Sequence, residues 1–346
     1  MNKLKLFGAL ALALFLLSGC NQESEQITLE GKTMGTTYHI KYIDEHTKEL
    51  LKPAEIKKEI DHLLVGVNNA MSTYQKDSEI SRFNQSIEIN KPFVISKDFA
   101  TVVKSAFELN KITQGALDIT VGPLVNLWGF GPDKRLNQAP TEQQIAEKSQ
   151  AVGINKIRLL SENNQFSLVK THSKVYIDTS SIAKGFGVDK LAQYLEQLGI
   201  ENYLVEIGGE LRAKGKNIHK DDWQIAIEKP TLVQGQEIQI LVPISNLGIA
   251  TSGSYRNYFE DDKGNRLSHI IDPKQLKPIS HNLASITVLA NTSMKADGLA
   301  TGLFVLGTDK ALEIAEREHL AIFLIIKTDN GYETKMSSEF KKLTHL

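Results

Sequence analysis

A single cysteine limits how this chain can be stabilised. Cys20 is the only cysteine among 346 residues, so the chain cannot form an internal disulfide. A hydrophobic core must therefore hold the fold together, and a chain of this length can bury enough apolar surface for one large domain or two smaller ones. No obvious linker divides the sequence, which favours one continuous domain.

The first twenty residues, MNKLKLFGALALALFLLSGC, are typical of an export signal. Lys3 and Lys5 precede an apolar run, and small residues precede Cys20. The run is too short and wrongly flanked for a membrane-spanning helix. Its end, LSGC, resembles the bacterial lipobox, which implies removal of residues 1–19 and lipidation of Cys20. The alternative is a plain secreted protein with a stray thiol.

The charge balance argues against nucleic acid as a partner. The formal net charge is -1, and no block of Lys or Arg follows the export signal. Residues 20–28 are predicted to form a short polar tether, and residues 29–346 the folded domain.

Several segments have the apolar spacing and the capping residues of amphipathic helices. The segment 295–307, KADGLATGLFVLG, is also helix-like. Two further helices are predicted over residues 53–71 and 185–198, and Gly199 ends the second of them. Ser96 is the predicted cap of a helix that ends before Gly115, and Thr141 with Gln144 forms the predicted capping box of another. A last helix is predicted to begin near Thr308.

Short β-type runs lie between these helices. They occupy residues 37–42, 175–177, 203–207, 223–227, 238–242, 284–288 and 321–325. Their alternation of apolar and polar residues fits half-buried antiparallel strands better than an all-parallel core. The sequence therefore predicts an α+β fold of mixed, largely antiparallel sheets with flanking helices.

The helix-like segment carries a carboxylate and a hydroxyl at helical spacing. Asp297 and Thr301 lie four residues apart, so both side chains point to one face. Hard oxygen ligands of this kind suit Mg²⁺ or Ca²⁺. The pair is either a cation site or a capping pair, and Gly298 and Gly302 beside it allow another backbone or a ligand to come close.

Three more stretches contain residues suited to ligand chemistry. Residues 176–187, YIDTSSIAKGFG, form a strand-to-helix turn with small residues and Lys184, which suits phosphate binding or is an ordinary capped turn. Residues 115–132 mix glycines, Asp118 and aromatic residues, which suits a flat ring or a tight turn in the core. His269, in residues 268–273, is a catalytic candidate or a structural histidine.

These four stretches, in this order, resemble the bacterial FAD:protein FMN transferases, also called ApbE-type flavin transferases. Further matching motifs occupy residues 31–38, 71–84, 206–210 and 251–256. The resemblance extends from about Thr28 to the end of the chain. It implies a T-fold-like architecture with a flavin cleft between lobes.

The resemblance also implies a reaction and its site. Proteins of the family take FAD, release AMP and attach FMN through its phosphate to a threonine hydroxyl of a partner protein. The implied Mg²⁺ ligands are the backbone carbonyl of Ser181 and the side chains of Asp297 and Thr301. The implied contacts with FAD are Met34, Tyr74, Ala116, Leu117, Asp118, Asp178, Lys184 and Ile270.

Phosphoryl transfer depends mainly on positioning and charge neutralisation. Lys184 is a candidate for a second positive charge beside the metal. The candidate proton acceptors are His269, Asp178 and Asp297, although a metal-bound carboxylate is a poorer base than a free one. Many relatives have glycine or alanine where residues 179–181 read Thr-Ser-Ser, which affects packing near the phosphates. The sequence Asp297 to Gly302 also resembles the acceptor motif of the family, but its hydroxyl comes one position too late for self-modification.

Two other functions fit the same residues. One is an FAD pyrophosphatase, in which water attacks the diphosphate and FMN and AMP are released. The other is a non-catalytic flavin-binding lipoprotein. The resemblance implies exported acceptors in membrane redox pumps, such as the sodium-translocating quinone reductase. With a lipid at Cys20, the protein would be held at the periplasmic face of a bacterial membrane, inner or outer.

Overall fold

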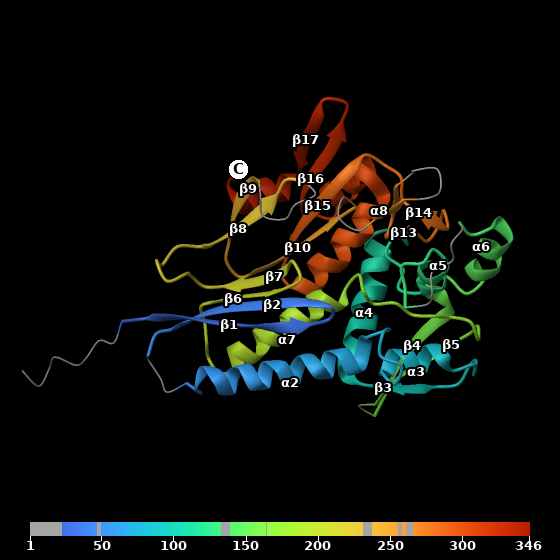
Figure 1. Ribbon diagram of the computed structural model, residues 1–346, viewed down its shortest axis with the longest axis horizontal. Helices are drawn as coiled ribbons and strands as arrows, with labels where there is room; N and C mark the ends of the chain where they lie inside the picture. Colours follow the sequence, from blue (N-terminus) through green and yellow to red (C-terminus); the bar gives the residue numbers. More distant parts are fainter. Residues whose placement is uncertain are drawn as a thin grey trace, which may run out of the picture.

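A sheet of eight strands runs through the computed structural model, which describes residues 23–346 except 47–49, 133–138, 164, 231–236, 255–257 and 261–265 (Figure 1). Every strand pair in this sheet is antiparallel, as the sequence predicts. The strands lie in the order β1 (Glu25–Thr33), β2 (Thr36–Asp44), β6 (Tyr203–Ile207), β7 (Glu210–Lys214), β10 (Leu247–Gly253), β15 (Leu283–Ala290), β16 (Ala321–Thr328) and β17 (Gly331–Met336).

The folded domain begins earlier than the sequence predicts. Strand β1 starts at Glu25, within the predicted tether 20–28, and its pairing with β2 runs from Glu25 opposite Asp44 to Thr33 opposite Thr36. The polar residues of this stretch pair through their backbones while Leu29 is buried. Composition alone therefore misassigned residues 25–28, whereas the export signal and Cys20 lie outside the described residues.

Helices cover one face of the sheet. Helices α7 (Ala183–Gln197) and α8 (Ser293–Arg317) pack directly on it, α2 (Pro53–Met71) packs against both β1 and α7, and α4 (Lys97–Ile112) packs against α8 (Figure 1). The opposite face is covered by the hairpin of β8 (Trp223–Glu228) and β9 (Ile238–Ile244) and by α9 (Ser338–Thr344).

Strand β16 shows how the sheet divides the core. Ile322, Leu324 and Ile326 pack on the helical face with α8 and α4, whereas the alternating Phe323 and Ile325 pack on the other face. The strand is thus apolar on both sides because both sides are covered.

A smaller lobe adjoins α4. It contains α3 (Glu79–Gln85), α5 (Gly122–Leu127), α6 (Glu142–Ser149), a short 3₁₀ turn (Ile154–Lys156), and a sheet of β3 (Phe93–Ile95), β5 (Gln165–Lys170) and β4 (Ile157–Glu162) (Figure 1). Two small hairpins are formed by β11 (Tyr258–Glu260) with β12 (Arg266–Ser268) and by β13 (Ile271–Asp272) with β14 (Lys277–Pro278).

The predicted helix caps are present. The Ser96 hydroxyl accepts the N–H of Phe99 at the start of α4, and Thr141 and Gln144 form the predicted reciprocal capping box at the start of α6. Side-chain capping satisfies N–H groups that have no partner inside the helix.

Helix α8 contains a break at Gly307, where φ is 73° and ψ is -179°. This backbone conformation is open almost only to glycine. The break explains why the sequence predicts a separate helix from Thr308. Nε2 of His281 donates to the carbonyl of Phe304 at 2.7 Å, at the end of the first half of the helix.

The predicted strand at residues 175–177 is absent. The side chain of Asn84 takes the place of a neighbouring strand, because its Oδ1 accepts the N–H of Ile177 and its Nδ2 donates to the carbonyl of the same residue. The N–H of Asp178, the next residue, donates to the backbone carbonyl of Ile119. The segment is therefore held in place by loops and a side chain rather than by a sheet.

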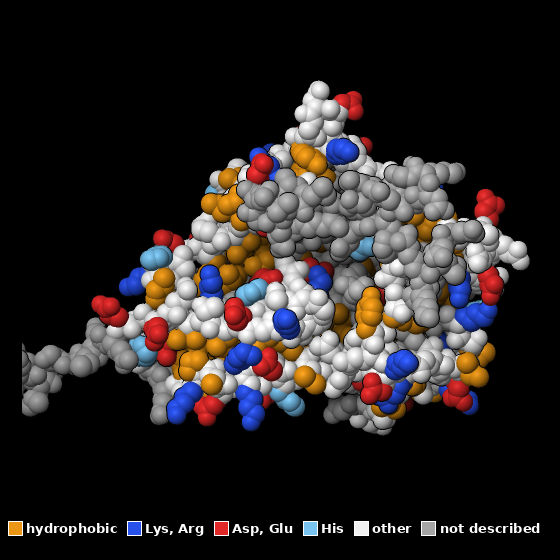
Figure 2. Space-filling view, viewed as in Figure 1, with side chains coloured by type: hydrophobic (Ala, Val, Ile, Leu, Met, Phe, Trp, Pro, Cys, Tyr) orange, Lys and Arg blue, Asp and Glu red, His pale blue; other side chains and the backbone are white. Residues whose placement is uncertain are grey.

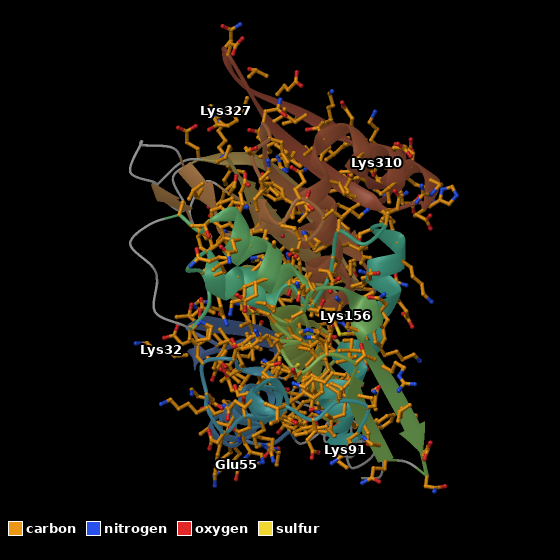
Figure 3. All side chains as sticks on the ribbon, turned by 90° about the vertical axis from the view of Figure 1, so that its right-hand side faces the viewer. Lys32, Glu55, Lys91, Lys156, Lys310 and Lys327 are labelled. Carbon is orange, nitrogen blue, oxygen red and sulfur yellow. The ribbon has the colours of Figure 1, made fainter. Side chains whose placement is uncertain are left out.

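Charged side chains of both signs are interspersed on the face shown in Figure 2, and this face is hollowed near its centre. In the turned view, Lys310 and Lys327 mark one end of the molecule and Glu55 and Lys91 the other (Figure 3). Within the described residues, no helix combines the length and apolar character needed to cross a membrane.

Candidate active site

The starts of α7 and α8 meet at a backbone-to-carboxylate hydrogen bond. The N–H of Gly185 donates to Oδ2 of Asp297 at 3.0 Å. A Cβ atom on Gly185 would lie 2.5 Å from the carbonyl oxygen of Ser293 and 2.7 Å from Cα of Met294. Gly185 is therefore required for the two helices to approach this closely.

A second carboxylate makes the reverse contact. Asp189 of α7 accepts the N–H groups of Ser293 and Met294, at 3.0 and 2.9 Å, and is paired with Arg212 of β7. Each helix start thus binds a carboxylate supplied by the other helix, which suits the positive end of a helix dipole. The two contacts fix the position of Asp297 relative to α7.

Thr301 lies one helical turn after Asp297, as the sequence predicts. Its hydroxyl shares a hydrogen bond with the hydroxyl of Ser252 on β10, at 3.3 Å. The pair at positions 297 and 301 therefore faces the strand β10 and the start of α7 together.

The two glycines of α8 serve close packing. A Cβ on Gly298 would lie 2.5 Å from Leu109 of α4, and one on Gly302 would lie 3.0 Å from Cβ of Leu117. The absence of side chains at both positions lets α8 pack tightly against α4 and the turn that follows it. Leu117 and its neighbour Ala116 are buried there.

Lys184 forms a buried ion pair with Glu210 of β7. Burial would lower the pKa of Lys184, but the charges of Glu210 and Asp297 outweigh it and raise that pKa. Burial and the charge of Asp297 raise the pKa of Glu210, whereas the ammonium group of Lys184 opposes the shift and favours the ionised carboxylate. Burial also raises the pKa of Asp297, and Lys184 and the N–H of Gly185 offset this only in part.

This cluster carries more negative than positive charge. Asp297 and Glu210 are each 4% exposed, and Lys184 is the cation beside them. Buried charge of one sign is costly unless it is neutralised. A divalent cation would restore the balance, and Mg²⁺ needs only one or two protein carboxylates when substrate phosphates supply further oxygens. The residues present therefore fit a Mg²⁺ ion.

No group of three or more His, Cys, Asp or Glu side chains suited to a metal occurs in the part of the chain that the structure describes. A site built from a single carboxylate, a hydroxyl and a backbone carbonyl would not form such a group. Ser181, the predicted carbonyl ligand, lies one turn before Gly185, in a turn whose Thr179 carbonyl accepts the N–H groups of Ile182 and Ala183.

Met34 also reaches the start of α7. It occupies the turn between β1 and β2 with φ 49°, and its sulfur lies 3.6 Å from the position of a Cβ on Gly187. The structure therefore brings Met34, Leu117, Ser181, Lys184, Asp297 and Thr301 to the region where α7 and α8 begin.

Two predicted carboxylates are used to organise loops. Asp118 accepts the N–H and hydroxyl of Thr120 and the N–H of Ile154, and burial raises its pKa. Asp178 accepts the N–H of Ser180. Both side chains thus hold the backbone of the turns that the sequence assigns to FAD binding.

The remaining predicted residues lie around the site or on the surface. The ring of His269 packs edge-on against Phe130, with centroids 6.5 Å apart, so it lies with the segment 115–132. Ile270 is buried, and its carbonyl accepts the N–H of Ile279. Tyr74 is 72% exposed in the turn after α2, and its contact with a flavin stays a prediction.

Comparison with known proteins identifies the family. The profile described as the ApbE family matches residues 34–324. The chain belongs to the ApbE family. It is 56% identical to the FAD:protein FMN transferase of Haemophilus influenzae, over 99% of each chain, and 49% identical to that of Vibrio cholerae, over 95% of this chain and 96% of the relative.

Solved structures of the family share the fold. The flavin transferase ApbE from Vibrio cholerae matches with a TM-score of 0.83 and 47% identity, over 92% of this chain and 99% of that one. The apo form of the Pseudomonas stutzeri flavinyl transferase ApbE matches with a TM-score of 0.83 and 34% identity, over 94% and 98%. The predicted α+β fold and family are confirmed.

Sequence reasoning missed three residues of this site. Glu210, Asp189 and Ser252 bind Lys184, the start of α8 and Thr301, respectively. Glu210 and Ser252 lie inside motifs that the resemblance uses, but their partners are distant in the sequence. Asp189 had no sequence signal, because an aspartate inside an amphipathic helix usually faces solvent.

Proposed function

We propose that this protein transfers FMN from FAD to a threonine hydroxyl of a target protein, with Mg²⁺, and releases AMP. The observation that carries the proposal is the buried cluster of Asp297, Lys184 and Glu210 at the meeting point of two helix starts. The curated relatives are named FAD:protein FMN transferase, which supports the same reaction.

The reaction exchanges one phosphorus–oxygen bond for another. The threonine oxygen attacks the phosphorus on the FMN side of the diphosphate, and the bond from that phosphorus to the bridging oxygen breaks. AMP leaves with the bridging oxygen, and the proton of the hydroxyl passes to a base. Such a transfer is promoted mainly by positioning and by stabilising the charge on the phosphate oxygens.

The residues that would hold Mg²⁺ are the carboxylate of Asp297, the hydroxyl of Thr301 and the backbone carbonyl of Ser181. When bound, the metal neutralises negative charge on the diphosphate and lowers the barrier to attack. Asp297 keeps one oxygen on the N–H of Gly185, which orients the other toward the site.

Lys184 supplies a positive charge beside the diphosphate. Its side chain is 31% exposed and that of its partner Glu210 is 5% exposed, so Lys184 lies at the edge of the buried cluster. A fixed cation stabilises the charge of the leaving phosphate without reorganisation during the reaction.

The proton acceptor is His269 or Asp178. His269 lies against Phe130 in the segment assigned to the flavin, and Asp178 lies in the turn before α7. The pH dependence of the transfer rate distinguishes the two residues. A general base must be unprotonated, so the rate falls at low pH. If this fall disappears in His269→Gln but not in Asp178→Asn, His269 is the base.

We further propose that the protein works outside the cytoplasm. The lipobox at residues 17–20 supports a lipid at Cys20 and a position at the periplasmic face of a membrane. Acceptors would then be exported domains of membrane redox pumps, such as the sodium-translocating quinone reductase. Mass spectrometry of the protein purified from membranes tests the lipid as an added mass on Cys20.

The decisive experiment incubates the protein with FAD, Mg²⁺ and an acceptor domain that carries a candidate threonine. Mass spectrometry should find one added FMN on that threonine, and none when the threonine is replaced by valine. Rapid release of FMN and AMP without acceptor would instead support the pyrophosphatase, and FAD binding without turnover would support a carrier.

A further inference from the structure

The side of α7 that faces β7 is joined to the strand by a row of ion pairs. Glu210, Arg212 and Lys214 alternate along β7 and therefore point to the same face of the sheet. Glu210 pairs with Lys184, Arg212 with Asp189 and Glu196, and Lys214 with Glu196 and Glu201. The first of these pairs contains Lys184, and the second contains Asp189, which binds the start of α8.

The environment of Glu210 differs from those of Glu196 and Glu201. Asp189 is as buried as Glu210, but it accepts two backbone N–H groups at the start of α8 in addition to its pairing with Arg212. Glu210 is 4% exposed, whereas the side chains of Glu196 and Glu201 are 29% and 63% exposed. A carboxylate buried this deeply is costly unless it has a charged partner in direct contact. Glu210 is nevertheless placed beside a second buried carboxylate, Asp297, whose charge opposes its own.

The contact restricts the position of Lys184. Lysine has a long flexible side chain, and a free ammonium group in the first turn of α7 would sample many positions. The ion pair with Glu210 ties the end of this side chain to the sheet. The ammonium group is thereby held at one place, beside Asp297, before any substrate binds.

We propose that Glu210 is a positioning residue for the transfer reaction, which holds the Lys184 ammonium group in the place where it stabilises the charge that develops on the diphosphate. This proposal rests on the proposed function of the site. The carboxylate acts through Lys184 and repels the diphosphate, so it favours turnover rather than substrate binding.

A double-mutant cycle tests the proposal. The variants are Glu210→Gln, Lys184→Met and the two combined, and the control is Glu196→Gln in the same row of ion pairs. We expect Glu210→Gln to lower kcat at least about tenfold while FAD binds as tightly as in the wild type or more tightly, because preorganised charge affects the transition state most. Glu196→Gln should keep kcat within about twofold, since changes outside such features have small effects.

The combined variant decides whether Glu210 acts through Lys184. Its kcat should equal that of Lys184→Met, because a positioning residue has no effect once the group that it positions is gone. It removes both buried charges together, so it tests the proposal even if Glu210→Gln alone does not fold. A further drop of tenfold in the combined variant, or a kcat of Glu210→Gln within twofold of the wild type, would overturn the proposal.

FAD affinity, measured by flavin fluorescence with and without Mg²⁺, provides a readout that does not depend on turnover. Weaker FAD binding in Glu210→Gln, together with an equal loss in Glu196→Gln, would show a structural role and overturn the proposal. If the wild type binds FAD but modifies no acceptor, the proposed function fails by itself. A difference in FAD affinity between Glu210→Gln and the wild type that is absent in the Lys184→Met background would still show that Glu210 acts through Lys184.

Discussion

The N–H of Gly185 donates to the carboxylate of Asp297 at 3.0 Å, although the two residues are 112 positions apart in the chain. This bond connects the phosphate-binding type of turn before α7 with the carboxylate on α8. Both features have weak signals in the sequence when each is taken alone. In the fold they lie together in a buried setting with Lys184, which makes them a candidate site.

Replacing Gly185 by alanine should damage this meeting point. The new Cβ would come within 2.7 Å of main-chain atoms of Ser293 and Met294, and main-chain atoms cannot rotate away. Overpacking of this kind costs about 1–3 kcal/mol of unfolding free energy. We also expect FMN transfer to fall at least about tenfold, because a small displacement of positioned groups is costly to catalysis.

Gly66→Ala is the matched control for that change. Gly66 lies inside α2, and a Cβ there would meet nothing within 4 Å. Alanine favours a helix over glycine by up to ~1 kcal/mol, so this variant should be more stable and equally active. Denaturant unfolding and acceptor labelling measure both variants. Full transfer activity in Gly185→Ala would show that the helix contact does not define the site.

Asp297→Asn tests whether the carboxylate is needed for chemistry or only for capping. Asparagine has the same size and still offers an oxygen to the N–H of Gly185. The variant should be as stable as the wild type or more so, because a buried negative charge near Glu210 is removed. Transfer should fall at least about 100-fold, since loss of even an outer partner of a metal site costs 10–100-fold.

Mg²⁺ dependence completes that test. In the wild type, Mg²⁺ should raise the melting temperature in the presence of FAD, and Asp297→Asn should lose this increase. Lower stability with unchanged turnover would indicate a capping role for Asp297 and would remove it from the proposed metal ligands.

Lys170 should make stability depend on pH in the alkaline range. Its ammonium group is buried, donates to the carbonyl of Phe83 at 3.0 Å and lies 5.0 Å from the ring centre of that residue. Burial lowers the pKa of Lys170 from 10.5 to about 8. The folded state therefore loses this proton at a lower pH than the unfolded chain does.

The direction in which stability changes with pH follows from the number of protons that the folded and unfolded states bind. Between about pH 8 and pH 10.5 the unfolded chain holds more protons at Lys170 than the folded protein, so this group makes the protein more stable as pH rises. Below pH 8 its contribution is constant and unfavourable. Unfolding free energies of the wild type and Lys170→Met, measured at pH 7, 8, 9 and 10, should differ by an amount that changes only above pH 8. A constant difference would exclude the shifted pKa.

Gly307→Ala should reduce stability and leave the chemistry intact. The backbone at Gly307, with φ 73° and ψ -179°, costs a residue with a side chain about 1–3 kcal/mol. Asp297 and Thr301 lie in the first half of α8, whose end is held by His281. Transfer per folded molecule should therefore stay within about twofold. A large loss of transfer at full stability would mean that the break controls the site.

The regular parts of this fold were predictable from local sequence. Apolar spacing gave α2 its correct bounds, and Ser96 and Thr141 gave the starts of α4 and α6, because caps and periodicity act within one or two helical turns. The strands at 203–207 and 321–325 were equally clear: alternate residues of the first are buried, and the second is a continuous apolar run that is buried on both faces.

Residues 175–177 show why local patterns fail elsewhere. They have the composition of a strand, but the partner that they find is the side chain of Asn84, more than ninety positions earlier. The same limit explains the missed members of the site: nothing near Glu210 in the sequence indicates Lys184, and nothing near Asp189 indicates the start of α8. Family resemblance predicts the ligand residues, and the structure shows which neighbours hold those residues in place.

The contact at Gly185 sets the spacing of α7 and α8 through main-chain atoms, with no side chain between them. Mutations in the surrounding hydrophobic core can therefore change side-chain volumes without altering that spacing. This holds for natural drift and for directed evolution toward heat resistance. The distance between the two helices at this point therefore depends on the absence of a side chain at position 185 rather than on the volume of the residues around it.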